Sequence, residues 1–154
     1  MISVEEALDK ILNHVSILEP EEKAILDSLG QVLTGDVHSD INVPPLDNSA
    51  MDGYAVQYES IEGASNSQPV FLKIIGEVAA GHISSQVVTP GTAVRIMTGA
   101  PVPAGADTVV QFEDTDEEGR KTAKQALDDI GIMRAVAKGS NVRRAGEDIA
   151  KGSL

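Results

Sequence analysis

The sequence contains no cysteine, and aromatic side chains make up only 3% of it. The missing thiols exclude disulfide bonds, thiolate metal sites and a cysteine nucleophile in this chain. With so few aromatic residues, a folded core must consist mainly of Val, Ile, Leu and Ala side chains. Hydrophobic residues nevertheless reach 42% of the 154 positions, which is typical of a globular chain rather than a disordered one.

Basic residues are also scarce, with 12 Lys and Arg against 24 Asp and Glu, so the formal net charge is −12. Nucleic acids and anionic membrane surfaces are bound mainly through basic side chains, so this charge argues against both as partners. An anionic substrate would need a local basic patch, a bridging divalent cation, or cationic groups from another domain. There is no apolar run of ~18 residues and no basic-then-apolar leader, so we predict a cytoplasmic protein.

The first residues predict an amphipathic helix. Ser3 followed by Glu6 fits a capping box, in which each side chain accepts a hydrogen bond from the other residue's backbone amide. Apolar residues then recur at spacings of three and four over 4–15, which places them on one helical face. A shorter helix is predicted within 20–30, where Pro and Glu suit its start and Gly its end, and a strand within 31–37.

Beyond two adjacent prolines at 44–45, the pattern changes to short apolar runs separated by Gly, Pro, Asn and Asp. Consecutive prolines fix φ and lack amide donors, so they favour an extended connection between structural units. Short strands with frequent turn residues are typical of small β-barrels and sandwiches. The predicted strands are Gly53–Gln57, Val70–Glu77, Ala93–Met97, Thr108–Phe112 and Ile132–Val136.

The stretch from 114 to 130 does not follow that pattern. Residues 116–119 resemble an exposed hairpin tip, whereas 122–130 has weak helical character, so its secondary structure stays open. We interpret the whole stretch as a solvated surface excursion. Residues 150–154 look like the start of a further strand that is cut short, so we expect the polypeptide to continue.

Three segments carry groups that could serve a functional site. The first, at 44–55, is a proline-stiffened loop with four oxygen-bearing side chains close together: Asp47, Asn48, Ser49 and Asp52. Such oxygen ligands suit a hard cation like Mg²⁺, which often takes one or two carboxylates and keeps several waters. Local chemistry alone favours a simpler explanation, namely Asx turns and an Asp-Gly turn that leads into a strand.

The second segment, RIMTGAPVPAGAD at 95–107, runs from a strand into a loop with two glycines and two prolines. Glycines let a ligand approach the backbone closely, and Thr98 at the strand exit could offer a hydroxyl to an oxyanion or a hydrated metal ion. Local chemistry again favours a rigid tight turn. The segment is not a phosphate-binding P-loop, because no Gly-Lys-Ser/Thr follows.

The third segment, NVRRAGEDI at 141–149, sets two arginines beside two acids. Arginine forks favour bidentate partners such as carboxylate or phosphate, so the segment could form a polar site. A structural turn held by ion pairs is the alternative, and local chemistry favours it. The 3 histidines lack metal-ligand spacing, and nothing in the sequence supports a Ser-His-Asp triad.

Taken together and in this order, these segments closely resemble the N-terminal region of the MoeA family, to which the gephyrin E domain also belongs. The opening helix and the stretch GQVLTGDV at 30–37 fit as well, and only about 57–70 and 114–131 fall outside the resemblance. The matching segments are PPLDNSAMDGYAV at 44–56, RIMTGAPVPAGADTVV at 95–110 and NVRRAGEDIAKGSL at 141–154.

The resemblance implies an α+β fold, mainly β, in which an elongated helix-and-strand domain is interrupted by a small β-barrel-like domain. On this sequence the discontinuous elongated domain corresponds to 1–44 and 139–154, and the inserted β-rich domain to 45–138. The family implies a homodimer whose active cleft lies between the second domain of one subunit and the third of the other. Nothing in 1–154 resembles the family's C-terminal domains, which include a pterin-binding glycine-rich loop.

The resemblance also implies an activity, the transfer of molybdenum from molybdate to adenylylated molybdopterin, with Mg²⁺, in molybdenum cofactor biosynthesis. By motif position, the family's functional aspartate falls on Asp52, which would handle the metal or molybdate. Its functional threonine falls on Thr98, which would contact an anion. The remaining substrate-binding candidates are Asp47, Asn48, Ser49 and Asp148. Without a pterin-nucleotide site to position the substrate, we expect the chain alone not to insert molybdenum.

Two other classes of function stay open. A protein-interaction or oligomerisation scaffold module, of the kind that gephyrin relatives provide, would expose an apolar groove. The enzyme interpretation instead expects Asp52 and Thr98 to face one open cleft. An unrelated β-barrel binding domain would require the motif matches to be accidental.

Overall fold

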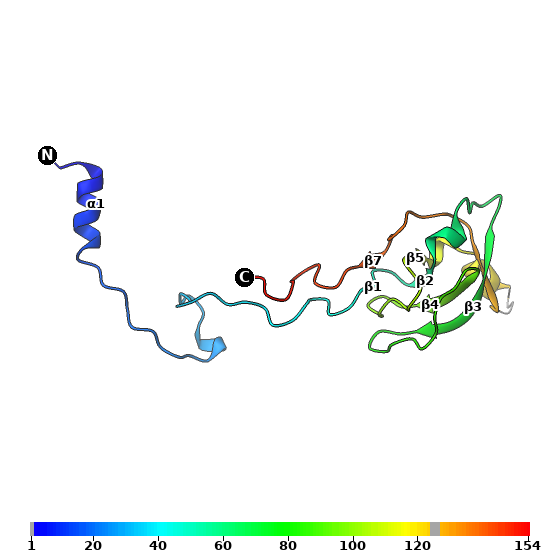
Figure 1. Ribbon diagram of the computed structural model, residues 1–154, viewed down its shortest axis with the longest axis horizontal. Helices are drawn as coiled ribbons and strands as arrows, with labels where there is room; N and C mark the ends of the chain where they lie inside the picture. Colours follow the sequence, from blue (N-terminus) through cyan, green and yellow to red (C-terminus); the bar gives the residue numbers. More distant parts are fainter. Residues whose placement is uncertain (1, 124–126) are drawn as a thin grey trace. The chain divides into compact units, whose positions relative to one another are not determined.

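The computed structural model describes residues 2–123 and 127–154 of a chain that separates into two units, Met1–Val37 and His38–Leu154. The first unit begins with α1 (Val4–Leu12), the helix predicted from the sequence (Figure 1). The capping box is confirmed, because Ser3 and Glu6 exchange side-chain to backbone hydrogen bonds of 3.1 Å each. The helix ends at Leu12 rather than at residue 15, where turn hydrogen bonds replace helical ones.

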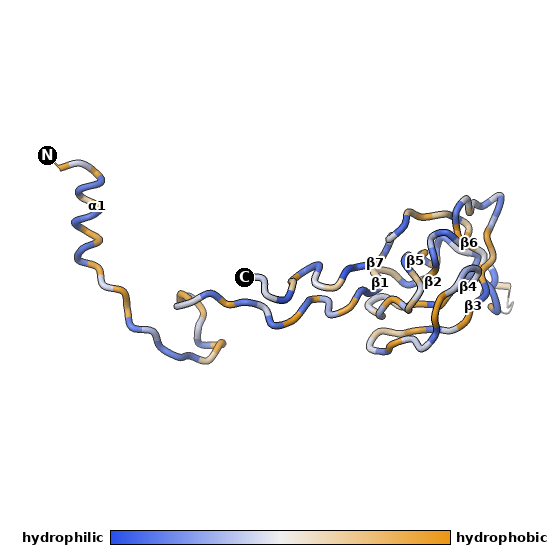
Figure 2. The backbone as a smooth tube through the Cα atoms, viewed as in Figure 1, coloured by the Kyte–Doolittle hydropathy of each residue, from blue (hydrophilic) through white to orange (hydrophobic). Residues whose placement is uncertain are grey.

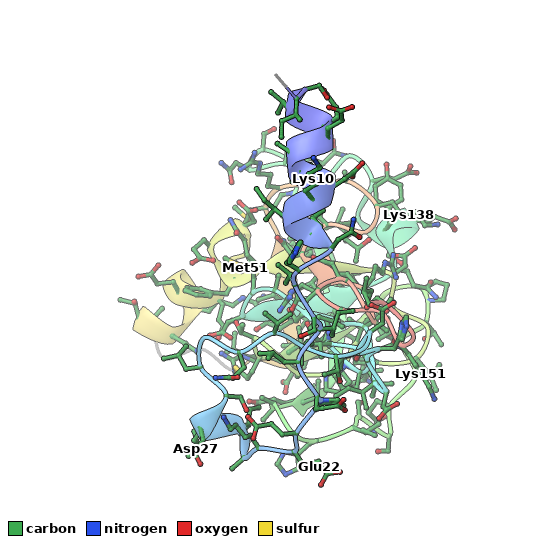
Figure 3. All side chains as sticks on the ribbon, turned by 90° about the vertical axis from the view of Figure 1, so that its left-hand side faces the viewer. Lys10, Glu22, Asp27, Met51, Lys138 and Lys151 are labelled. Carbon is green, nitrogen blue, oxygen red and sulfur yellow. The ribbon has the colours of Figure 1, made fainter. Side chains whose placement is uncertain are left out.

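The second predicted helix and the strand after it are wrong. Residues 20–30 contain one 3₁₀ turn, η1 (Ile25–Asp27), and 31–37 form no strand in the described structure. A short helix gains most of its stability from burying an apolar face, and a strand needs a partner. None of the residues from 2 to 37 is buried, and apolar positions are spread along this unit in Figure 2. The side chains of Glu22 and Asp27, labelled in Figure 3, are likewise exposed.

The second unit is built on a curled five-stranded sheet that forms a half-barrel (Figure 1). Its order is β5-β2-β4-β3-β6, in which β3 and β4 run parallel and the other neighbours antiparallel. The mainly β fold expected from the sequence is therefore confirmed. The strands are β2 (Gly53–Val56), β3 (Val70–Val78), β4 (Thr92–Ile96), β5 (Thr108–Gln111) and β6 (Asp129–Ile132).

The last predicted strand, at 132–136, is wrong because β6 ends where it was expected to begin. Ile130 and Ile132 are both fully buried, so the alternating apolar side chains that enter the core are those of β6 itself. The segment read as an exposed hairpin tip instead opens a helix, α2 (Glu117–Thr122), whose first residue is buried. Part of the stretch left open, 124–126, lies outside the described residues.

The core of the second unit is aliphatic, as the composition predicts. Among the described residues, Tyr54 is the one buried aromatic side chain. Two clusters make up this core, one on each face of the curled sheet, because neighbouring residues of one strand such as Tyr54 and Ala55 belong to different clusters. Each cluster takes residues from several strands. The first contains Tyr54, Val56, Ile61, Ala64, Leu72, Ala93, Val110, Ile130 and Ile132, and the second Ala55, Val78, Val88, Val94, Ile96, Ala100 and Val109.

A two-stranded ribbon joins the half-barrel to the segments on either side of it. In Figure 1 the cyan chain of 38–49 and the orange-to-red chain of 141–153 run side by side. The pairing includes β1 (Asn48–Ser49) with β7 (Val142–Arg143), and it continues in backbone hydrogen bonds as far as Ser39 and Ser153. The domain bounds predicted from the sequence stay a prediction. No helix in the described parts of the chain is long and apolar enough to cross a membrane.

Candidate functional site: the Asp52–Thr98 pair

The pairing of β2 with β4 brings two loops to the same end of the sheet. Asp52 directly precedes β2, and Thr98 follows shortly after β4. Because the strands are antiparallel, with Gly53 opposite Ile96, the entrance of one lies beside the exit of the other. The two residues singled out from the resemblance, 46 positions apart, are therefore neighbours in the fold.

Asp52 accepts two hydrogen bonds from Thr98 on a single oxygen. The Thr98 amide lies 2.7 Å and its hydroxyl 2.8 Å from Oδ1 of Asp52. These bonds, the amide more than the hydroxyl, stabilise the ionised carboxylate and lower the pKa of Asp52 below its ordinary value. Both residues are exposed, and no described residue engages the second oxygen, Oδ2, of Asp52.

Glycine next to Asp52 is required by a close approach of two strands. A Cβ atom on Gly53 would overlap the backbone carbonyl oxygen of Val110 on β5. Glycine after Thr98 is required by its backbone, because Gly99 has a φ of 80°, in the left-handed region. The Gly99 amide also donates to the carbonyl of Ser49 at 2.8 Å, which fastens the two loops together.

The side chains of the neighbouring candidates Asn48 and Ser49 differ in their hydrogen bonds. Ser49 is fully buried, and its hydroxyl both donates to the carbonyl and accepts from the amide of Met51, the loop residue labelled in Figure 3. This is a local turn, as the simpler explanation of the segment predicts. The buried side-chain oxygen of Asn48, by contrast, has no hydrogen-bond partner among the described residues.

Asp47 and Asp148 belong to a second group of polar residues, on the ribbon. Asp47 accepts from Arg144 at 2.6 Å and from the amide of Ala145 at 2.8 Å. The amide first, and then the guanidinium, lowers the pKa of Asp47. Asp148 receives both of its 2.6 Å hydrogen bonds from one nitrogen of Arg143. In the described structure neither aspartate is bonded to Asp52 or Thr98, so the candidates form two groups.

Sequence reasoning missed a buried charge cluster beside the pair. Glu117, only 2% exposed, accepts a hydrogen bond from the phenol of Tyr54 and forms ion pairs with Arg95 and Lys121. Burial alone would raise the pKa of Glu117, but these partners together lower it. The cluster depends on the register of β2 against β4, which sets Tyr54 opposite Arg95. The local residue pattern does not reveal that register, so the cluster has no signal in the sequence.

The described residues supply part of the ligand set of a Mg²⁺ site rather than all of it. Over 2–123 and 127–154, no three His, Asp or Glu side chains gather as a metal ion would require. Asp52 nevertheless offers one unengaged carboxylate oxygen, and Mg²⁺ is often held by a single carboxylate when waters and substrate phosphates complete its shell. A hollow of about 560 Å³ lies along residues 76–86, and neither Asp52 nor Thr98 lines it.

Comparison with known proteins identifies the family of this chain. The family model for the MoeA N-terminal region, domains I and II, matches residues 2–154. The chain belongs to the MoeA family. Its similarity therefore extends through both loops of the Asp52–Thr98 pair and through the ribbon that carries Asp47 and Asp148.

Named relatives of this MoeA chain include molybdopterin molybdenumtransferase 2 of Mycobacterium tuberculosis, 38% identical over 153 residues. The molybdopterin molybdenumtransferase of Bacillus subtilis is 37% identical over 155 residues. A crystal structure of the molybdopterin biosynthesis MoeA protein of Pyrococcus horikoshii superposes with a TM-score of 0.83 at 34% identity. These matches cover 97–99% of this chain but only 35–38% of the relatives, so the chain spans about a third of their length.

Proposed function

We propose that this chain supplies the N-terminal part of a molybdopterin molybdenumtransferase. The full-length enzyme transfers molybdenum from molybdate to adenylylated molybdopterin in a Mg²⁺-dependent reaction. The names of relatives with 37–38% identity support the activity at the family level. The observation that carries the assignment to this chain's own residues is the Asp52–Thr98 contact, which joins two of the three family segments in one exposed pair.

In this proposal the Asp52–Thr98 pair and the polar residues on the ribbon have different roles. Asp52 would hold the divalent cation, whose charge offsets that of phosphate and molybdate oxygens when it is bound. Thr98, held by Asp52 at 2.7 and 2.8 Å, keeps the loop 97–100 in place beside it. Asp47, Asn48, Ser49 and Asp148 are proposed substrate-binding residues. Asp47 is bonded to Arg144 and Asp148 to Arg143, and Asn48 and Ser49 pair with β7.

A chain of this length is proposed to be inactive by itself. Molybdenum insertion requires the pterin nucleotide to be held against the reacting oxygens, and correct positioning contributes much of an enzyme's rate. The relatives are roughly three times as long, and the family resemblance assigns the pterin-binding loop to their later domains. We expect the 154-residue chain, mixed with adenylylated molybdopterin, molybdate and Mg²⁺, to form no active cofactor.

The decisive experiment replaces Asp52 by Ala in a full-length protein that carries this N-terminal region. We expect molybdenum insertion to fall by at least about tenfold while thermal unfolding changes little, since Asp52 is exposed. Glu118→Ala, an exposed carboxylate with no bonded partner in the described structure, is the matched control and should leave insertion unchanged. Undiminished insertion by the Asp52 variant would contradict the assigned role.

A scaffold or oligomerisation function is the second candidate, and the first unit favours it. Large aliphatic side chains at α1 are exposed, among them Val4 at 80% and Ile11 at 63%. Contiguous exposed apolar surface marks a site of association. We propose that this unit contributes to a homodimer, which sedimentation of the full-length protein and of a Val4→Ser/Ile11→Ser double variant would test. The cytoplasmic location stays a prediction.

A further inference from the structure

One buried carboxylate bonds to both of the strands that lead to the Asp52–Thr98 pair. Oε2 of Glu117 accepts the phenol hydrogen of Tyr54, on β2, over 2.9 Å. Oε1 of Glu117 accepts a hydrogen bond from Nε of Arg95, on β4, over 3.2 Å and lies 3.1 Å from its Nη2. The Glu117 side chain is only 2% exposed, so water competes little for these bonds. Glu117 therefore adds a side-chain connection to the backbone pairing of β2 with β4.

This connection lies at the end of the sheet where the pair is formed. Tyr54 and Arg95 are register partners. Tyr54 follows Asp52 by two positions, and Arg95 precedes Thr98 by three. Nη1 of Arg95 also lies 3.8 Å from the sulfur of Met97, the residue just before Thr98. A shift of Tyr54 or Arg95 would therefore move the adjoining loop with it, because so few residues intervene.

The pair itself has no comparable support on its outer side. Asp52 and Thr98 are both exposed, and the described structure joins them by two hydrogen bonds to one oxygen, Oδ1 of Asp52. Exposed side chains exchange readily between rotamers. The geometry of the pair therefore depends on how firmly the ends of β2 and β4 behind it are held.

We infer that Glu117 is a positioning residue for the Asp52–Thr98 pair and acts through Tyr54 and Arg95. This inference rests on the proposed function and deepens it by adding a residue to the machinery. The family resemblance assigns Glu117 no role, because the residue lies in 114–131, outside the matching segments. Glu117 sets the rate of molybdenum transfer by holding the pair in place, and it leaves binding of the pterin nucleotide to the other domains.

The neighbouring residue, Asp116, separates positioning of the pair from simple anchoring of α2. Oδ1 of Asp116 accepts the amide of Gly131, on β6, over 2.8 Å, and its Oδ2 pairs with Arg120 at 2.9 Å. Strand β6 is an edge of the sheet, and β3 lies between it and β4. A change at Asp116 therefore loosens the same helix without removing a bond to β2 or β4.

Kinetics of a full-length protein that carries this N-terminal region test the inference. Glu117→Gln keeps the shape of the side chain but only one of its two acceptor oxygens, so it cannot serve both Tyr54 and Arg95. We expect kcat for molybdenum insertion to fall about tenfold while KM for adenylylated molybdopterin stays within about twofold. Tyr54→Phe, which removes one donor, should lower kcat about threefold. Asp116→Asn should leave kcat within about twofold of the original.

Nuclear magnetic resonance of the ¹⁵N-labelled 154-residue chain reports on the pair without any molybdenum chemistry. The amide proton of Thr98 is deshielded by its 2.7 Å hydrogen bond to the Asp52 carboxylate. Glu117→Gln should shift this signal upfield and speed its hydrogen exchange about tenfold, because the bond is held less firmly. Asp116→Asn should leave the Thr98 signal where it is.

The outcomes divide plainly. Equal losses of kcat in Glu117→Gln and Asp116→Asn would show that Glu117 only anchors α2, and an unmoved Thr98 signal in Glu117→Gln would show that its influence ends at the strands. Either result overturns the inference. If Glu117→Gln does not fold, Tyr54→Phe decides the question by the same two measurements, since its ring stays in the core.

Failure of the proposed function gives a different result. A full-length protein that never inserts molybdenum would contradict that function, whereas the response of the Thr98 signal to Glu117→Gln would still support the connection from Glu117 to the pair. A protein that inserts molybdenum at the original rate in spite of Glu117→Gln would keep the function and overturn the inference.

Discussion

The phenol hydroxyl of Tyr54 donates a 2.9 Å hydrogen bond to the carboxylate of Glu117, which lies 63 residues further along the chain and is almost fully buried. Arg95 completes the contact from the adjacent strand, where it is the register partner of Tyr54. Through this cluster, α2 is fastened to the half-barrel next to the loop that carries Thr98.

Replacing Glu117 by Ala should lower the free energy of unfolding by about 2–4 kcal/mol, because the side chain of Arg95 would lose its buried partner. Glu118→Ala on the exposed side of the same helix should stay within about 0.5 kcal/mol of the original protein. Chemical denaturation of both variants measures the difference. Equal stability of the two would show that the cluster does not hold α2 in place.

Replacing Gly53 by Ala should destabilise the half-barrel by more than about 3 kcal/mol, since the new methyl group would meet backbone rather than a movable side chain. Gly119→Ala provides the contrast, because nothing lies within 4 Å of its Cβ position and it sits in α2. That variant should be neutral or more stable by up to about 1 kcal/mol. Thermal unfolding checks both, and a Gly53 variant as stable as the original would refute the close approach.

The titration of Asp52 should respond to Thr98. The amide and hydroxyl of Thr98 hold the pKa of Asp52 below its ordinary 3.8, and Thr98→Val removes only the hydroxyl. The pKa of Asp52 should therefore rise part of the way towards 3.8 in that variant, as ¹³C resonances of the carboxyl group would report. No rise would mean that the hydroxyl does not donate to this carboxylate.

The sign of the accompanying stability change follows from linkage. Because the pKa of Asp52 is lower in the folded protein, its contribution is present above the ordinary value of 3.8 and is lost as the pH falls through the folded value. Solvent screening keeps this contribution small, below about 1 kcal/mol. Thr98→Val should reduce the acid-dependent part of the unfolding free energy while leaving its slope above pH 5 unchanged.

Asp47→Asn should loosen the turn at 143–147 without unfolding the ribbon. The carboxylate accepts the amide of Ala145 at 2.8 Å and the guanidinium of Arg144 at 2.6 Å, but its side chain is 40% exposed. We expect faster hydrogen exchange at the Ala145 amide and a loss of stability below about 1 kcal/mol. Asp148→Asn, whose partner is Arg143, should leave exchange at Ala145 unaltered.

Which structural elements the sequence predicts depends on how far apart along the chain the residues that stabilise each element lie. The capping box of Ser3 and Glu6 and four of the five sheet strands were predicted, because caps and alternation act between near neighbours. The helix predicted within 20–30 and the strand predicted within 31–37 are wrong. None of those residues is buried, so no burial of apolar surface stabilises either element. Strand β6 was displaced because the apolar pattern around Gly131 is interrupted by charge and glycine.

The sequence by itself determined the family, the aliphatic core, and which loops hold the polar candidates, because motifs and local propensities are written in residue order. Only the tertiary structure decided that Asp52 and Thr98 meet, that Ser49 is turned inward, and that Glu117 is buried beside Arg95. Those outcomes follow from the register of β2 against β4 and of β1 against β7. Strand register is chosen by how the whole core packs, so no single segment contains it.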